Sequence, residues 1–306
     1  MNFRTPLPSS FSAPMTVADA QRLGVTPGQL RNPSLGRPFH GVRSPPDCEP
    51  TIRTLASAYR PLLPEGGVFS HTTAAMLHDM PLPAYARRTA LHVTSPAEIR
   101  AREGNGVHGH HLALSADEMV LINGLPCTSA ARTWCDLAPL LGFLDLVAAG
   151  DRLLWYECPM VEKSTLVRAV DQAAGRRGVV ALRAALPMLS NRSQSPKESR
   201  TRLIIENSRL PAIAANIEIG IARTGRLLRV DLGFERFRLA LEYEGDHHRT
   251  DRGQWRKDIR RVEDLAEEGW ETMRITDDDL ADEHELVERI ARRLTARAWS
   301  DPWSTR

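Results

Sequence analysis

The sequence has few cysteines and no long apolar run, and both shortages exclude classes of protein. Its four cysteines form no Cys-x-x-Cys pair, which argues against a thiolate zinc site or a disulfide framework and predicts buried free thiols. No stretch approaches the roughly 18 uninterrupted apolar residues of a membrane span, so we expect no transmembrane helix. The N-terminal segment lacks the apolar core of a secretory signal, which predicts a cytoplasmic protein with no membrane partner.

An excess of charge of one sign is also missing. The 40 basic and 38 acidic residues give a net charge of +2, so any contact with DNA must come from local basic patches. The basic residues are arginines except Lys163, Lys197 and Lys257. With 42% hydrophobic and 25% charged residues over 306 positions, the chain has the composition of a globular protein and room for two domains.

Helix-boundary residues near the N-terminus predict two short helices. Thr16 can cap a first helix that Gly24 ends, and Thr26 can cap a second helix with Pro27 at its first position. Two short helices separated by a tight turn are typical of a helix-turn-helix.

Residues 36–43 would form a β-wing after these helices, which predicts a winged helix-turn-helix module over residues 14–60. Such a module places its second helix in the major groove of DNA. The candidate DNA contacts are then Thr26, Gln29 and Arg31. A small helical packing module that never touches DNA fits the same spacing.

A mixed α/β region follows. Residues 70–77 read as a capped helix, residues 91–94 alternate like a strand, and residues 128–137 are helical. Together with the N-terminal module, this region resembles the abortive-infection type IV antitoxin-like (AbiEi) regions of actinobacterial proteins, over roughly residues 14–155.

Three histidines in this region invite a metal hypothesis. His108 and His110 have the i,i+2 spacing of a metal pair on a strand, and His111 follows them. Because no carboxylate or cysteine lies nearby in the sequence to complete a site, structural or hydrogen-bonding histidines are favoured.

The strongest linker signal, which contains three serines and ends in a proline, covers residues 190–196 and marks the main domain boundary. Beyond it the pattern predicts a helix, three strands, a helix, a strand and a helix. The predicted division is a disordered tail at 1–13, the winged module at 14–60, an α/β region at 61–155, a helical connector at 156–194 and a nuclease-like domain at 195–300.

The two central strands of that domain each carry an acid. Alternation places Val230, Leu232 and Phe234 on one face and Asp231 on the other. A turn centred between Arg236 and Phe237 would put Asp231 directly opposite Glu242. At about 5 Å and an effective dielectric near 20, this repulsion is on the order of 3 kcal/mol.

A divalent cation would remove that repulsion, and hard carboxylate ligands on rigid strands suit Mg²⁺ or Mn²⁺. Such an ion can polarise a phosphoryl oxygen and activate a water, as in a nuclease. The alternative is a solvated polar face on which the carboxylates pair with Arg229 or Arg238.

The C-terminal region, about residues 192–297, resembles the restriction-endonuclease-like PD-(D/E)XK fold, and more narrowly the very-short-patch-repair (Vsr)-like family. The matching segments are residues 195–200, 230–232, 241–248 and 255–260, and the pattern Leu265-x-x-x-Gly269-Trp270-x-x-x-Arg274. The resemblance implies an α/β (α+β) fold with a central mixed sheet flanked by helices, and a metal-dependent nuclease. It also implies Asp231 and Glu242 as metal ligands, with Glu198 at the edge of the site.

The sequence departs from the general pattern at one position. Glu244 stands where a lysine is expected, two residues after the strand acid. Vsr-like members also lack that lysine, and the histidines after the strand, His247 and His248, are candidates for general acid–base work or are simple surface histidines. Lys257 on the next helix is a candidate for the missing positive charge.

Glu198 has a second explanation, because Ser195-x-x-Glu198 with Pro196 at the first helical position satisfies the capping-box rule. The densest basic run is on the helix that follows the central strands. It is either a solvated face or a phosphate clamp for DNA, formed by Arg252, Arg256, Lys257, Arg260 and Arg261.

Three functional hypotheses follow. The first is a Mg²⁺- or Mn²⁺-dependent DNA endonuclease directed by an N-terminal DNA-binding module, with a homodimer as a candidate assembly. The second is an antitoxin-like or regulatory DNA-binding protein whose nuclease fold has lost catalysis, which Glu244 in place of lysine favours. The third is a protein-interaction module.

Overall fold

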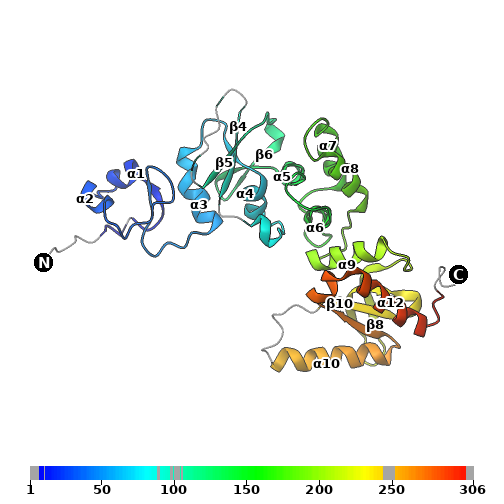
Figure 1. Cartoon of the computed structure of the whole chain (residues 1–306). Helices are drawn as coiled ribbons and strands as arrows, with labels where there is room; N and C mark the ends of the chain where they lie inside the picture. The colour runs from blue at the N-terminus through cyan, green and yellow to red at the C-terminus, as the bar shows by residue number, and fades with distance from the viewer. Residues whose placement is uncertain are drawn as a thin grey trace. The chain divides into compact units, whose positions relative to one another are not determined.

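The computed structural model describes residues 7–9, 11–87, 90–96, 99, 104, 106–243 and 252–300, and for residues 252–257 the backbone alone. The chain has the predicted α+β composition and forms two compact units (Figure 1). The first contains Met1–Leu141 and Lys163–Arg183, and the second contains Gly142–Glu162 and Ala184–Arg306. None of the helices in the described ranges has the length and apolar character of a bilayer-spanning segment.

The N-terminal module has four short elements: β1 (Met15–Thr16), α1 (Val17–Arg22), α2 (Pro27–Leu30) and β2 (Val42–Arg43). Thr16 and Thr26 cap the two helices as predicted, and Gly24 adopts φ +85° directly after the first. The second helix is a single turn, since Pro33 follows closely and disfavours helical backbone before it. The segment predicted as a wing contributes β2, which pairs antiparallel with β1, and a single antiparallel bridge between Gly36 and Ser44.

The rest of the first unit is built on a five-stranded sheet of order β5-β4-β3-β7-β6. Its strands are β3 (Val68–Phe69), β4 (Leu91–Ser95), β5 (Val107–His111), β6 (Met119–Ile122) and β7 (Leu125–Thr128). The helices that accompany it are α3 (Ile52–Tyr59), α4 (His71–Leu77), α5 (Ala130–Leu137) and α7 (Lys163–Gln172). All four cysteines are free. Cys127 and Cys135 are buried as predicted, but Cys48 is half-buried and Cys158 is exposed, so the prediction of burial is wrong for these two.

The stretch predicted as a helical connector, residues 156–194, is shared between the two units. Helix α7 packs on α5 in the first unit, and α8 (Val179–Met188) crosses the division. Helix α6 (Phe143–Leu154) falls within the predicted α/β region at 61–155, but it belongs to the second unit and packs on α9 (Pro196–Glu206). An amphipathic pattern predicts that a helix has a buried face but not which neighbour covers it, and this explains the difference.

The second unit carries a four-stranded sheet of order β11-β10-β9-β8, in which only β10 and β11 are parallel. Its strands are β8 (Ala214–Ile221), β9 (Arg226–Phe234), β10 (Leu239–Tyr243) and β11 (Glu271–Ile275). Its remaining helices are α10 (Arg252–Glu267), α11 (Asp277–Ala281) and α12 (Glu283–Ala296). The element order is the predicted one except for the short helix α11, which the prediction lacked.

Helices cover both faces of this sheet. Leu232 and Leu241 pack with residues of α9 and α12 in one core, while Val230 and Ala240 pack with Leu265 of α10 in another. Figure 1 shows α10 on one side of the strands and α9 and α12 on the other. The sheet therefore presents its central acids between α9 and α10.

Candidate active site in the C-terminal sheet

Asp231 lies where the two central strands separate. The predicted hairpin register is confirmed by the pairs Leu239–Phe234, Ala240–Gly233 and Leu241–Leu232, without a bulge at Gly233. The ladder ends one pair short of Asp231 and Glu242, so the two acids are not the paired cross-strand neighbours that we predicted. Instead, the Tyr243 N–H donates to Asp231 Oδ2 over 3.1 Å, and the carboxylate takes the place of a strand carbonyl.

Strict alternation of side chains also ends at this point, which corrects the predicted faces. Val230 packs in the core beneath α10, whereas Leu232 and Phe234 pack in the core beneath α12. The register of β8 places Asn216 opposite Asp231, but this pair is missing from the ladder and Asn216 adopts φ +51°. Asparagine tolerates left-handed backbone, and such backbone interrupts the regular pleat. The distortion therefore changes the direction of the side chains at Asp231.

Glu198 projects toward the same place from the first turn of α9. Its backbone N–H donates to Ser195 Oγ over 3.2 Å, as the capping rule predicts. Its carboxylate reaches one residue beyond the cap and accepts from the Gln194 N–H over 2.9 Å. Glu198 is buried and lies beside Asp231. Its role at the start of α9 and a place at the edge of the site are therefore compatible.

Both carboxyl groups are held in an environment that disfavours their charge. Burial raises the pKa of Glu198, and the nearby charge of Asp231 raises it further. Burial likewise raises the pKa of Asp231, opposed by the Tyr243 N–H and by the charges of Arg261 and Arg229. Neither carboxylate has an ion pair with a described residue. Protonation or a bound cation would each relieve this unfavourable environment.

Glu242 has a different partner. Both Nε and Nη2 of Arg261 donate to its Oε1, over 2.8 and 2.6 Å. This pair relieves the repulsion from which we inferred a cation. The arginines that the sequence suggested for this role bind elsewhere: Arg229 pairs with Glu157, and Arg238 donates to the Glu268 carbonyl.

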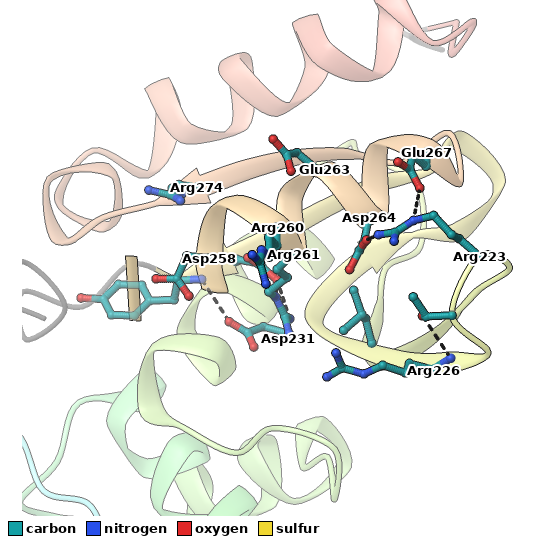
Figure 2. A pocket seen from close by; sticks show the side chains of 14 residues that line it. Arg223, Arg226, Asp231, Asp258, Arg260, Arg261, Glu263, Asp264, Glu267 and Arg274 are labelled. Carbon is teal, nitrogen blue, oxygen red and sulfur yellow. Dashed lines mark hydrogen bonds and ion pairs between the residues drawn. The ribbon is translucent and has the colours of Figure 1, made fainter. Parts of the chain in front are cut away.

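A groove of about 890 Å³ runs between α10 and the sheet, with Asp231 and Glu242 in its lining. Figure 2 shows Asp231 close to Arg261, while Arg223 reaches Asp264 and Glu267 farther along. Five arginines and six carboxylates line the groove, so it has no surplus of positive charge. Of the predicted phosphate clamp, Arg260 and Arg261 line the groove.

The residues fit a divalent cation in part. Asp231 and Glu198 offer two carboxylates without ion pairs, which suffices for a Mg²⁺ that retains waters and binds phosphate. Glu242 is held by Arg261, and no set of three ligand atoms within 4.8 Å of one another includes these acids in the part of the chain described. A third protein ligand therefore requires Glu242 to leave Arg261.

The remaining predicted site residues divide into three groups. Glu244, His247 and His248 lie outside the described residues, as do the side chains of Arg252, Arg256 and Lys257 on α10. In the N-terminal module, Thr26 and Gln29 form a reciprocal capping box, so both predicted DNA contacts are engaged locally. Arg31 is exposed at the end of α2.

Sequence reasoning missed one cation at the site. Lys197 Nζ lies 5.7 Å from the centre of the Tyr243 ring and pairs with Asp277. It immediately precedes Glu198 in the matched segment, which was the available signal. Lys197 is therefore a second candidate, beside Lys257, for the positive charge that Glu244 does not provide.

Replacement of Glu198 by glutamine is expected to stabilise the protein. Between the ordinary pKa of a glutamate and its raised folded value, the folded state binds more protons, so stability falls as pH rises through that window. Glu198→Gln removes this loss and can still accept from the Gln194 N–H. We expect unfolding at pH 7.5 to cost about 1 kcal/mol more and Tm to rise by about 2–4 °C.

Thermal unfolding followed by circular dichroism measures this change. Glu218→Gln, an exposed acid on β8, is the matched control and should shift stability by less than about 0.5 kcal/mol. An unchanged or lower Tm for Glu198→Gln would mean that the fold fully compensates this carboxylate.

Comparison with known proteins finds relatives but no family. No protein-family model matches the chain. It is 29% identical over 267 residues to the uncharacterized proteins MT2308 and Rv2248 of two Mycobacterium tuberculosis strains, covering 87% of this chain and 94% of each relative. Among solved structures, it is similar to the Rv2827c protein of Mycobacterium tuberculosis, with 16% identity, a TM-score of 0.37, and coverage of 61% of this chain and 74% of the other.

Proposed function

We propose that the chain is a metal-dependent DNA endonuclease that acts in the cytoplasm. The observation that carries the proposal is the pair Glu198 and Asp231. These two carboxyl groups form no ion pair with a described residue, yet α9 and β9 hold them close together, with Glu198 buried and Asp231 half-buried. The order of helices and strands in the second unit, with a mixed sheet between helices, supports the resemblance to the restriction-endonuclease-like fold.

Asp231 and Glu198 would hold the ion, with Glu242 as a third ligand once Arg261 releases it. When bound, Mg²⁺ or Mn²⁺ supplies Lewis-acid polarisation of the phosphoryl oxygen and a water of lowered pKa. The Tyr243 N–H fixes the orientation of the Asp231 carboxylate. Arg260 and Arg261 line the same groove and are placed to contact DNA phosphates.

The charge of the groove makes DNA affinity depend on the cation. Because acids slightly outnumber arginines in its lining, phosphate is not attracted to the empty groove as a whole. A divalent ion at Asp231 and Glu198 would offset that excess of negative charge. We therefore expect DNA binding to be tighter with Mg²⁺ than with a chelator.

The ion pair between Arg261 and Glu242 favours a second function. With Glu242 neutralised by an arginine, the fold can persist as a DNA-binding scaffold without catalysis, directed by the N-terminal module. Arg31, exposed at the end of α2, is a candidate phosphate contact in that module. Binding of this kind is salt-sensitive, because it releases counterions from DNA.

Nicking of supercoiled plasmid by the full chain tests the proposal. We expect relaxed product with Mg²⁺ or Mn²⁺ and none with EDTA. A protein that binds DNA at low salt, yet nicks it with neither metal, would support the binding function instead. A protein that neither binds nor nicks DNA would favour the interaction module.

A further inference from the structure

A cluster of histidines lies in the first unit, apart from the acids of the C-terminal sheet. His71 is the first residue of α4, His92 lies on β4 and His110 lies on β5. One ligand atom from each lies within 4.8 Å of the other two, and in the described part of the chain this is the one such set of three. The three histidines are far apart in the sequence, and it is the tertiary fold that brings them together.

The sheet explains how two of these side chains meet. Strands β4 and β5 are parallel, with His92 paired to His108 and Thr94 paired to His110. Because residues two apart share a face, His92, His108 and His110 all stand on one side of the sheet. The N-terminus of α4 lies against that side, where the His92 N–H donates to Thr73 Oγ1 over 2.8 Å.

We propose that His71, His92 and His110 form a binding site for one transition-metal ion of the zinc class. His92 Nδ1 and His110 Nε2 are 3.0 Å apart. Two nitrogens bound to one tetrahedral Zn²⁺ at about 2.0–2.1 Å are separated by roughly 3.4 Å, so a small movement suffices. The rings of His71 and His110 are stacked, with centroids 3.7 Å apart, and must tilt to share an ion.

Neighbouring hydroxyl groups position the His71 ring for this role. Ser70 Oγ lies 2.9 Å from His71 Nδ1 and accepts from Thr94 Oγ1 over 2.8 Å. With Nδ1 engaged by Ser70, Nε2 is the nitrogen of His71 that can bind an ion. Metal-binding histidines commonly make such a hydrogen bond through the other ring nitrogen, and it fixes the tautomer.

His71 also has an unfavourable backbone conformation. It is buried and adopts φ +49°, a left-handed conformation that costs on the order of 1 kcal/mol or more for a residue of this size. The rest of the fold holds this conformation, which directs the imidazole toward His110. A binding role accounts for the strain.

The donor set determines the class of ion. Three imidazoles without a carboxylate or thiolate in the set suit Zn²⁺, Co²⁺, Ni²⁺ or Cu²⁺ and do not suit Mg²⁺. Burial and the neighbouring imidazoles lower the pKa of His71 to about 2 and that of His92 to about 4, so both rings are neutral at neutral pH. A tetrahedral ion held by three histidines keeps a fourth position for water or for the exposed His108.

The surroundings permit this added charge. Arg132 is close enough to influence His71, and it is buried. Its guanidinium is paired with Glu118 over 2.9 Å and with Asp136 over 2.8 Å. The two carboxylates together offset the arginine, so it does not oppose binding as a lone cation would.

Metal titration of the full chain, with any histidine tag removed, tests the site. We expect one equivalent of Zn²⁺ in competition with a chromogenic chelator, and visible absorption typical of tetrahedral nitrogen ligation with Co²⁺. His92→Gln and His110→Gln should each weaken Zn²⁺ binding at least 100-fold. His111→Gln, next to His110 but on the opposite face of β5, should bind like the wild type.

Zn²⁺ should also protect His92 and His110 of the wild type, which are only half-buried, from modification by diethyl pyrocarbonate, as mapped by mass spectrometry, and this readout does not depend on the folding of a variant. Failure of the wild type to bind Zn²⁺ or Co²⁺ overturns the proposal. Equal binding by folded His92→Gln, His110→Gln and His111→Gln overturns it too, and so does protection confined to other histidines. None of these readouts involves DNA cleavage, so they are independent of the proposed nuclease.

Discussion

Asp231→Asn should lose Mg²⁺-dependent nicking by at least about 100-fold. A metal ion stabilises the charge of the transition state by several kcal/mol, and each 1.4 kcal/mol is a factor of ten in rate. The change removes one negative charge and little else, because the amide oxygen of asparagine can still accept from the Tyr243 N–H. Burial raises the pKa of Asp231, so the variant should fold at least as stably as the wild type at neutral pH.

Asp264→Asn is the matched control for this experiment. Asp264 of α10 lines the same groove, but it is paired with Arg223 and lies farther along the groove than Asp231 (Figure 2). We expect its nicking rate to stay within a few-fold of that of the wild type. Equal nicking by wild type and Asp231→Asn would place the activity outside this site, and equal losses in both variants would indicate a general effect of groove charge.

The C-terminal fold was predictable because its signals are local. The cap at Ser195 and the turn between Arg236 and Phe237 act over a few residues, and the structure has both. The end of the ladder was not predictable in this way. It depends on the Tyr243 N–H finding Asp231 and on the left-handed backbone of Asn216, which lies on another strand.

Tertiary pairing also decided the partners of the charged side chains. The dense run of basic residues on α10 predicted a basic face but not the direction of each arginine. Arg260 and Arg261 are about 100° apart around the helix, and only Arg261 reaches Glu242. The spacing of His108 and His110 likewise suggested a metal pair. His92 comes beside His110 through the parallel pairing of β4 with β5, and His71 comes from the start of α4, so neither leaves a short-range signal.

A buried network of polar contacts around Asp151 of α6 holds the helix that carries Glu198. Asp151 of α6 is almost fully buried and accepts from Arg202 Nη2 over 3.0 Å, from Ser199 Oγ over 2.7 Å and from the Ser190 N–H over 2.7 Å. Arg202 and Ser199 belong to α9, one turn or less from Glu198. This network therefore holds in place the helix that carries the candidate ligand.

Asp151→Ala should cost about 3–5 kcal/mol in the free energy of unfolding of the second unit, because it leaves a buried guanidinium without this partner. For a unit of this size, Tm should fall by roughly 10 °C. Asp145→Ala, in the first turn of the same helix, should cost less than about 1 kcal/mol. Thermal unfolding monitored by tryptophan fluorescence compares the two variants. If they lose the same small amount, Glu206 and the Met188 carbonyl, which Arg202 also contacts, are enough to hold Arg202 and α9 without Asp151.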